Sequence, residues 1–598
     1  MENKKQAIIL SGVAIVALLA LIIGATYAYF RASGNSGSNT DINVTTYTLD
    51  LLSFEMGSDI KINADQTSFA SGKGNATGST FAKAILTANN KTNTATKNYY
   101  MYLNISNNTF TYTQNENTPE LLLTITDVSG NAITSITGLT YKTVIDGKGT
   151  SVSGFDITTK SGLLTLFDNR EITASPTKTE EWNVTVTFVN YNVNQTGNAG
   201  KSFNAKLMIQ QEEYELTLAD ICAGKTLSDC VISQYTGTQG DNALYYHNST
   251  LTNGAGDNSY RYAGGDYVLT EAGKATGATM MIGYNNSVTT ALIDFYCNGT
   301  KQYVGYASSC STSHYYLIKG DTTQYQTYNE ALNASVEKGY LTKDNVKNFV
   351  CFGSDATTCP TENLYRIIGV FNNHVKLIKY DYAKSSLLGT DGDFSQEYTS
   401  NYFSGEQGES PSSNSLYYWN NAGTNTWSAS KLNTVNLNTN FTTNIGTAWA
   451  NKIATTTWKV GGGTYANLRD AVPKTAYQYE VGSSASTTTY DAKIGLMYVS
   501  DYYYSASPSA WTLVGYNSDY TKSYASAKGE NWLYGGGWDW TISRNSDYSH
   551  DAFGVDYYGS VSYYYVSGNT GVRPSFSLLS STTYVSGSGS MSDPVRIN

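Results

Sequence analysis

The chain has 598 residues, 14 % of them charged, and a formal net charge of −10. A chain of this length exceeds what one hydrophobic core organises, so we expect about two to four domains. Nucleic-acid binding is excluded, because phosphate recognition needs clustered Lys and Arg and the sequence has no such cluster. β-branched and aromatic residues in short runs, separated by Gly, Asn and Ser, predict a multidomain, β-rich protein.

Residues 7–30 are an uncharged, almost wholly apolar segment with two lysines before it and Arg31 after it. A helix of this length crosses the ~30 Å hydrocarbon core of a bilayer. The lysines favour a cytoplasmic N-terminus, so we assign 1–31 to a single-pass anchor in the cell membrane, with the bulk of the chain extracellular. A cleaved signal peptide is the alternative, with a poor cleavage site at 25–28. A buried core helix is the third interpretation.

A spacer rich in Gly, Ser and Asn follows at 32–44, and the region 45–213 then shows the alternation typical of strands. In Trp182–Phe188 the apolar residues recur at every second position, as in a strand with one buried face. About six to eight such runs make a β-sandwich, and we expect a sandwich stalk. The expected strands lie near 47–51, 99–112, 121–128, 163–167, 182–191 and 203–210.

The apolar segment ends in an aromatic-Ala-aromatic sequence, Ala25-Thr26-Tyr27-Ala28-Tyr29-Phe30, which a short spacer and the expected sandwich follow. In this arrangement, over about residues 27–213, the chain resembles the camelysin and TasA-like proteins, exported fibre and matrix subunits of Gram-positive bacteria. The resemblance implies a stalk or assembly module. A generic immunoglobulin-like spacer is the alternative.

The six cysteines occur as three pairs of close neighbours along the chain. Outside the cytoplasm, an even number of cysteines spaced in this way predicts short-range disulfides. Free buried thiols are the alternative. Zinc is not favoured, because no pair has C-x₂₋₄-C spacing and only His314 lies near any of them. The expected disulfides join Cys222 with Cys230, Cys297 with Cys310, and Cys351 with Cys359.

Residues 214–350 are expected to form a connector and a small insert, with a short helical segment near 219–222 and a helix over 325–336. The loop at 253–258 is too rich in Gly and Asn for regular structure. Asp257 and Asp266 offer oxygen ligands for calcium, but their spacing is not that of an EF-hand, so we prefer solvated turns.

The distal region, 351–598, begins with a hairpin in which two apolar runs, 364–371 and 375–379, flank an Asn-rich turn. One short helix is expected at Leu432 and Val435. A second carries the stripe Phe441, Ile445, Trp449 and Ile453, with 438–440 as the separating cap. Strands are expected at 494–499, 511–514, 538–542, 561–566 and 572–579. This order predicts an α+β domain.

The run Tyr365–Val370 near the start of this region and Gly571-Val572-Arg573-Pro574 near its end bracket Tyr418-Trp419-Asn420 and Trp427. With these motifs the region resembles an uncharacterised family of bacterial extracellular domains, over about 240 residues. The resemblance implies a C-type-lectin-like fold, related to the formylglycine-generating enzymes, and an extracellular location, but no reaction. Ser575 departs from the bulky apolar residue usual there.

Eight of the nine tryptophans follow Val350, and amphipathic rings of this kind stack on sugars or anchor protein partners. Strand alternation places Trp538 and Trp540 on one face and Asp539 on the other, with core packing as the alternative. The candidate ligand-binding residues are Trp538, Asp539, Trp540, Tyr502, Tyr503 and Tyr557. Asp391 and Asp393 are a weak calcium candidate, so no cofactor or metal is assigned.

No catalytic residue is assigned. The absence of cysteine after Cys359 excludes formylglycine chemistry, and the four histidines (His247, His314, His374 and His550) belong to no recognised nucleophile or metal motif. His374, in a predicted turn, and His550 are expected at the surface. The sequence predicts a membrane-anchored surface protein of a Gram-positive-type bacterium, an adhesin that binds a glycan or a surface protein. A self-associating fibre or matrix subunit is the second hypothesis, and a cell-wall glycan enzyme with paired carboxylates is the third.

Overall fold

The computed structural model describes residues 50–64, 72–89, 93–214, 217–282, 290–302, 310, 313–343, 345–398, 414–514, 530–535, 537–556 and 559–598. The predicted anchor and spacer, and the candidate residue Tyr557, lie outside these ranges. Within these ranges, no helix combines the length and the apolar character that a membrane crossing needs.

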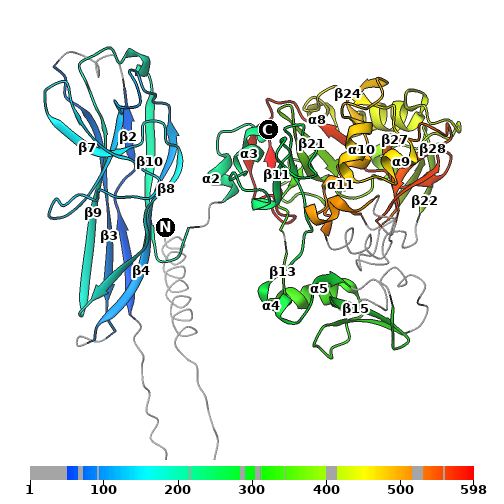
Figure 1. The fold of residues 1–598 in the computed structure, drawn as a ribbon, viewed down its shortest axis with the longest axis horizontal. Helices are drawn as coiled ribbons and strands as arrows, with labels where there is room; N and C mark the ends of the chain where they lie inside the picture. The colour runs from blue at the N-terminus through cyan, green and yellow to red at the C-terminus, as the bar shows by residue number, and fades with distance from the viewer. Residues whose placement is uncertain are drawn as a thin grey trace, which may run out of the picture.

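The first described part of the chain is a β-sandwich of two antiparallel sheets, which confirms the predicted fold of this region (Figure 1). One sheet has the strand order β1-β3-β9-β5-β7-β6 and the other β2-β10-β4-β8. The strands are β1 (Leu51–Met56), β2 (Ile60–Asn63), β3 (Ala76–Thr87), β4 (Ala95–Asn108), β5 (Leu121–Asp127), β6 (Tyr141–Ile145), β7 (Ser151–Asp156), β8 (Gly162–Ala174), β9 (Thr177–Phe188) and β10 (Ser202–Gln210), with a 3₁₀ turn η2 (Thr196–Asn198) before the last.

The alternation along β9 has the expected consequence for packing. Trp182, Val184 and Val186 are buried between the sheets, whereas Asn183 is exposed. The sandwich therefore has a core of its own, built from the inward faces of both sheets.

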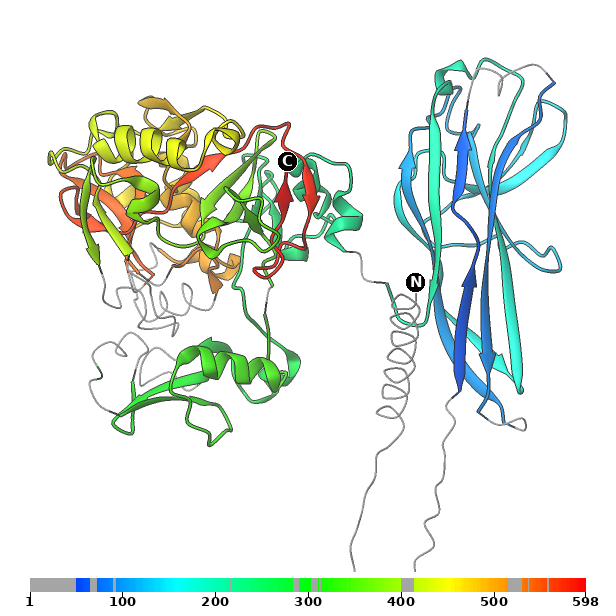
Figure 2. The same ribbon diagram turned by 180° about the vertical axis from the view of Figure 1, so that it is seen from behind.

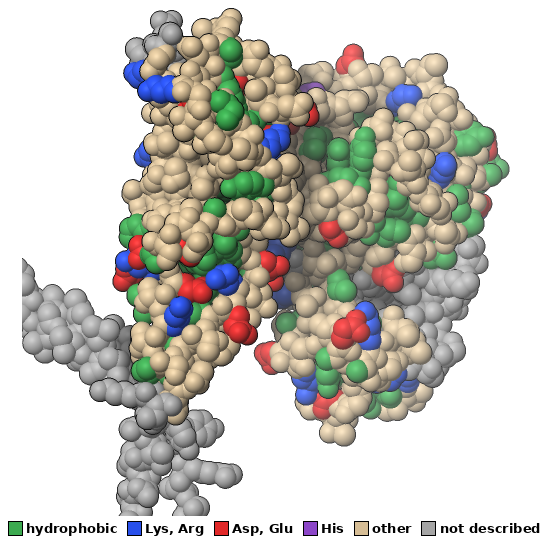
Figure 3. Space-filling model, turned by 60° about the vertical axis from the view of Figure 1, so that its left-hand side comes forward, with side chains coloured by type: hydrophobic (Ala, Val, Ile, Leu, Met, Phe, Trp, Pro, Cys, Tyr) green, Lys and Arg blue, Asp and Glu red, His purple; other side chains and the backbone are tan. Residues whose placement is uncertain are grey.

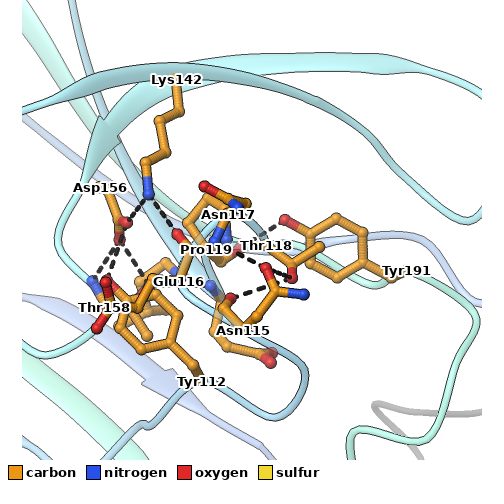
Figure 4. A network of polar contacts seen from close by, with 12 residues as sticks. Tyr112, Asn115, Glu116, Asn117, Thr118, Pro119, Lys142, Asp156, Thr158 and Tyr191 are labelled. Atoms are coloured by element: carbon orange, nitrogen blue, oxygen red, sulfur yellow. Dashed lines mark hydrogen bonds and ion pairs between the residues drawn. The ribbon is translucent and has the colours of Figure 1, made fainter.

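A polar network closes one end of the sandwich around the loop 112–119 (Figure 4). The Asp156 carboxylate accepts hydrogen bonds from Lys142 Nζ at 2.8 Å, from Tyr112 at 3.0 Å, and from both the hydroxyl and the backbone N–H of Thr158. Lys142 Nζ also donates to the backbone carbonyl of Glu116. These bonds hold the loop against the sheets and lower the pKa of Asp156 against the opposing effect of burial.

The surface in view in Figure 3 is dominated by uncharged polar side chains and backbone, with Lys, Arg, Asp and Glu scattered between them. This distribution agrees with the low share of charged residues in the chain. Hydroxyl and amide groups therefore supply most of the polar surface.

The second body of the structure begins at residue 217 and has a separate hydrophobic core (Figures 1 and 2). Its central sheet has the order β11-β12-β20-β21-β31-β26, with β19 paired to β20. We call residues 217–266 and 345–598 the head. The sheet strands are β11 (Leu244–Tyr246), β12 (Tyr260–Tyr262), β19 (Phe349–Cys351), β20 (Leu364–Phe371), β21 (His374–Lys379), β26 (Ile494–Gly495) and β31 (Ser575–Ser577).

The hairpin β20–β21 forms where the sequence predicts it. Asn372 and Asn373 both have positive φ, 49° and 62°, the left-handed conformation that a two-residue hairpin turn requires. At Gly369, a Cβ atom would lie 2.2 Å from the carbonyl oxygen of Tyr260, so only glycine lets β12 pair with β20 here.

Residues 267–343 form a small lobe, the insert, with its own hydrophobic cluster. Both ribbon views show it joined to the head through β13 and the chain after β18 (Figures 1 and 2). The predicted helix over 325–336 is present as α5, whose N-terminus carries a capping box between Thr327 and Glu330. The elements are β13 (Val268–Leu269), α4 (Glu271–Ala275), β14 (Met280–Ile282), β15 (Ala291–Cys297), β16 (Thr300–Gln302), β17 (His314–Ile318), α5 (Tyr328–Glu337) and β18 (Leu341–Thr342).

The three predicted disulfides are confirmed, and no cysteine is free. Cys222–Cys230 joins the helices α2 and α3, Cys297–Cys310 lies in the insert, and Cys351–Cys359 lies at the end of β19. Each bridge closes a loop of few residues and is therefore a local constraint on the chain.

The two helices predicted in the head are present, but the break between them lies at a different position. A π-helix, η7, runs through Asn438–Asn440, and the break comes at Gly446, whose φ is 86°. The stripe is nevertheless buried, at Phe441, Ile445, Trp449 and Ile453. A π-helix has more residues per turn than an α-helix. Apolar residues at every fourth position therefore do not show where one helix ends and the next begins.

Three predicted strands of the head are shorter than expected or absent, and one of them, 572–579, contains only the three-residue β31. The run 494–499 contains only the two-residue β26 before α11 begins at Val499, and 511–514 overlaps the 3₁₀-helix η8 instead of a strand. Pro508 at the start of η8 favours this helical turn. The remaining strands are β22 (Phe394–Tyr398), β23 (Asn414–Tyr418), β24 (Thr456–Lys459), β25 (Thr489–Ala492), β27 (Asp539–Arg544), β28 (Asp551–Val555), β29 (Val561–Tyr565), β30 (Asn569–Thr570), β32 (Tyr584–Ser586) and β33 (Arg596–Ile597).

Short helices cover the sheets of the head. They are α2 (Leu218–Cys222), α3 (Leu227–Ser233), η3 (Asp241–Ala243), η5 (Thr361–Asn363), α6 (Ser385–Leu388), η6 (Trp427–Ala429), η7 (Leu432–Phe441), α7 (Thr442–Asn444), α8 (Thr447–Ala450), α9 (Tyr465–Leu468), α10 (Pro473–Glu480), α11 (Val499–Tyr504) and η8 (Pro508–Thr512).

Candidate functional site

The structure places two of the candidate ligand-binding tyrosines in the interior of the head. Tyr502 and Tyr503 lie on α11 instead of a loop, and both are completely buried. Their hydroxyls donate to the backbone carbonyls of Gly559 at 2.7 Å and Leu468 at 2.9 Å. These bonds satisfy the polar ends of the rings, so both side chains act as core residues in this structure.

The Trp538-Asp539-Trp540 segment is also largely internal. Trp540 is completely buried and donates from Nε1 to the carbonyl of Tyr417 at 2.9 Å. Trp538 is half-buried, with its ring centroid 4.1 Å from that of Tyr564. Both tryptophans pack around Tyr564, which corresponds to the core-packing alternative.

Asp539 is held by the Gly-Val-Arg-Pro motif. Arg573 Nε donates to its carboxylate at 2.5 Å, and Arg573 Nη2 donates to the carbonyl of Leu533. Complete burial raises the pKa of Asp539 to about 6, an effect that outweighs the nearby guanidinium. At Gly571 a Cβ atom would lie 2.1 Å from the ring of Tyr382, so glycine is required for this approach. The motif is therefore a packing element.

The four aspartates considered for calcium are engaged by protein donors. Asp257 is paired with Arg261 at 2.6 Å, and Asp266 with Arg366 at 2.7 Å. Asp391 accepts from Asn440, and Asp393 accepts the backbone N–H groups of residues 421 and 432. In the ranges that the structure describes, no three His, Cys, Asp or Glu residues are grouped so as to hold a metal ion.

The histidines lie in different environments. His550 is exposed, as expected for a loop residue, and His374 is half-buried beside the carbonyl of Leu578. His247 is completely buried among Tyr504 and Trp511, and burial holds its pKa well below the usual value. A neutral, internal His247 is a packing residue.

Two adjoining cavities of the head remain as the candidate site, and we call them the Lys379 cavities. The first, of about 210 Å³, lies between the central sheet, the segment 531–535 and helix α5 of the insert. The second, of about 240 Å³, lies between the end of β21, η5, α6 and α7. Lys379, Asp381 and Tyr382 line both cavities, so the end of β21 and the residues after it form their common wall.

Lys379 is the chemically distinctive group of this wall. Its side chain is buried, with Nζ donating to the carbonyl of Glu362 at 3.0 Å and lying 5.8 Å from the centre of the Tyr365 ring. Burial lowers its pKa to about 8, while Asp381 and Glu362 oppose this shift. An amine with this pKa is uncharged in an appreciable fraction of molecules under mildly alkaline conditions.

Tyrosines and amides supply most of the remaining lining. Tyr267, Tyr328 and Tyr380 border the first cavity together with Asn329, and two further asparagines border the second. Carboxylates and further amines lie among them. The lining therefore offers hydrogen-bond donors, acceptors and flat rings to a polar ligand of small size.

A buried arginine holds the insert in place beside the first cavity. Arg366 makes a forked pair with Asp266, with both contacts at 2.7 Å, and donates to Asn348 at 2.6 Å and to the carbonyl of Val346 at 3.1 Å. Its guanidinium lies between the rings of Phe349 and Trp532, at 4.2 and 4.6 Å.

Asp266 precedes the insert and Val346 follows it, so Arg366 fixes both chain segments that enter and leave this lobe. The width of the first cavity depends on these Arg366 contacts, because they hold the insert and its helix α5 forms one wall of the cavity.

Sequence reasoning did not find Lys379 or Arg366 as site residues. The sequence does carry a signal, in Val375-Lys376-Leu377-Ile378-Lys379. The two lysines of this otherwise apolar strand are three positions apart, and an odd separation places them on opposite faces. Both faces of that strand are buried, so each lysine needs a specific environment.

Comparison with known proteins yields no match: no family model, no curated protein and no solved structure is similar to this chain at a significant level.

Proposed function

We propose that the protein is a bacterial surface protein, anchored by its N-terminal segment, whose head binds a ligand outside the membrane. The three disulfides support an extracellular location, because such bonds persist in oxidising compartments. The sandwich serves as the stalk that carries the head, and the protein acts as an adhesin.

The Lys379 cavities are the proposed binding site, and the composition of their lining is the observation that carries this proposal. Tyrosine rings, amides, carboxylates and amines in the lining suit a carbohydrate, whose hydroxyls need donors and acceptors and whose C–H faces stack on rings. A C-type-lectin-like fold for the head belongs to the same proposal. Its support is the Gly-Val-Arg-Pro motif, buried beside the central sheet.

A glycan array probed with the full chain tests the proposal. We expect a defined set of glycans to bind, and we expect Asp381→Ala to weaken binding by roughly tenfold or more, because a polar contact in a ligand site is worth about 1.5 kcal/mol or more. Asp355→Ala is the matched control, since Asp355 is exposed and lines neither cavity. Equal loss in both variants, or binding unaffected by either, would remove the assignment to these cavities.

A fibre subunit is the second candidate function, and a feature of the sandwich favours it. The outer strands of the six-stranded sheet, β1 and β6, expose apolar side chains: Leu51 and Met56 are 63 % and 45 % exposed, and Ile145 is 60 % exposed. Edge strands of this kind pair with strands of another molecule.

Light scattering of the full chain over a range of concentrations distinguishes the two candidates. A fibre subunit forms growing assemblies that Ile145→Lys abolishes, whereas an adhesin of the proposed kind stays at one molecular mass.

A further inference from the structure

A buried lysine and a buried aspartate meet in the head, away from the Lys379 cavities. Lys376 on β21 points its Nζ to within 2.5 Å of Oδ2 of Asp501 on α11. The two side chains are only 8 % and 3 % exposed. Neither residue lines the described cavities, and no step of the proposed function uses them.

Aromatic rings form the walls around this pair. The Lys376 Nζ lies 4.6 Å from the centre of the Tyr498 ring, 5.2 Å from that of Trp458 and 5.9 Å from that of Phe371. These rings keep water from the amine and carboxyl groups. In such surroundings the two groups have little hydration and contact each other directly.

Both partners are held in place by their backbones. Lys376 lies in the middle of the central sheet, paired with Gly369 of β20 and Ser577 of β31. Asp501 caps the start of α11, where its Oδ2 also accepts the backbone N–H of Tyr498 at 2.8 Å. A nucleophile and an electrophile held together in this manner react at effective molarities of about 10⁵ M or more.

Two further charged groups are close to Asp501. Arg261, buried on β12, interacts electrostatically with it, and Glu480 on α10 accepts the backbone N–H groups of Val499 and Ser500 at the start of the same helix. Burial raises the pKa of Glu480, and this carboxyl group is held at the first turn of α11 by these two hydrogen bonds.

A second lysine–aspartate pair, in the sandwich, differs in the exposure of its lysine and in the hydrogen bonds to its aspartate. Lys142 is 24 % exposed, and the Asp156 carboxylate accepts several hydrogen bonds that lower its pKa (Figure 4). These donors keep Asp156 as a carboxylate, which is a poor electrophile. The pair serves as an internal control.

We propose that Lys376 and Asp501 condense into an intramolecular amide bond after the head has folded. The proton of the ammonium passes to the carboxylate, and the neutral amine nitrogen then attacks Cγ of Asp501. The Cγ–N bond forms, the bond from Cγ to one carboxyl oxygen breaks, and that oxygen leaves with two protons as water. No oxidant, reductant or other reactant is needed.

The bond would join β21 to α11 across 125 positions of the chain. A covalent link of this length restricts the unfolded chain more than the three short-range disulfides do, and it survives reduction. A surface protein gains resistance to proteolysis and to pulling from such a bond.

Mass spectrometry of the full chain, with the disulfides reduced, tests the proposal. We expect the wild-type protein to be lighter than its sequence by one water, and Lys376→Met to have the full mass of its own sequence; N-terminal processing affects both equally. In a tryptic digest we expect cleavage after Lys142, no cleavage after Lys376, and one branched peptide that contains Asp501.

Wild-type protein at the full mass, with a linear peptide ending at Lys376, would overturn the proposal. This result needs no variant to fold, since it is read from the wild-type chain.

Discussion

Replacing Arg366 by alanine tests how the insert is held on the head. The change removes a guanidinium that pairs with Asp266 through two 2.7 Å contacts, donates to Asn348 and Val346, and is stacked between two rings. Loss of one partner from a buried ion pair costs about 3 to 5 kcal/mol, because the other partners lose their donors.

Asp266 retains 34 % exposure, so water compensates part of its charge, and we expect a loss near the lower end, about 3 kcal/mol in the free energy of unfolding. Arg366→Lys keeps the charge but not the fork, and we expect it to recover less than half of the loss. Urea denaturation followed by fluorescence measures both values.

Hydrogen exchange locates the effect. We expect faster exchange at β13 and β18, where the insert joins the head, and unchanged exchange in the sandwich, which has its own core. Arg469→Ala is the control, because Arg469 is partly exposed and pairs only with the neighbouring Asp470 among described acidic groups. A loss below about 1 kcal/mol for Arg366→Ala, the value typical of a surface pair, would refute this reasoning.

Three further predictions concern single groups. Replacing Cys351 and Cys359 by serine is expected to lower the unfolding free energy by about 2 to 3 kcal/mol, since the bridge closes a short loop; an unchanged denaturation midpoint would contradict this. The raised pKa of Asp539 means that the folded state binds the extra proton, so stability falls as the pH rises from about 4 to about 6; Asp539→Asn should flatten this slope in denaturation curves, and an identical slope would oppose the assignment. The pKa of Lys379 is lowered to about 8 in the folded state, so between about pH 8 and about pH 10 the unfolded chain keeps this proton and the folded chain does not. The free energy of unfolding should therefore rise over this range, and the rise should disappear in Lys379→Met.

Local sequence signals predicted the parts of the fold that depend on neighbouring residues. The turn at Asn372-Asn373 and the strand through Trp182 follow from short-range preferences, and both are present. The cysteines pair with their nearest neighbours along the chain, which is why their spacing sufficed.

Burial of aromatic residues was harder to predict, because the partners that permit it are distant in the chain. The hydroxyl of Tyr502 is satisfied by a carbonyl 57 positions away, and Nε1 of Trp540 by one 123 positions away. A run of tyrosines has the same composition in a core as on a surface. The ligand platform expected at these residues therefore depended on contacts that no local pattern reveals.

The candidate site was missed for the same reason, because it too is formed by residues that are distant in the chain. Lys379 becomes unusual only where β21 meets η5 and the first turn after the sheet, and Arg366 only where the insert returns to the head. The sequence shows that both charged residues lie within apolar strands, but it does not show the cavities or the residues that contact them.

Protease treatment of intact cells tests most directly whether the head is displayed outside the membrane. We predict that added protease cleaves the chain on intact cells and releases fragments of the head, detected by an antibody to the C-terminal region. A head that stays whole on intact cells and is digested only after lysis would contradict the account.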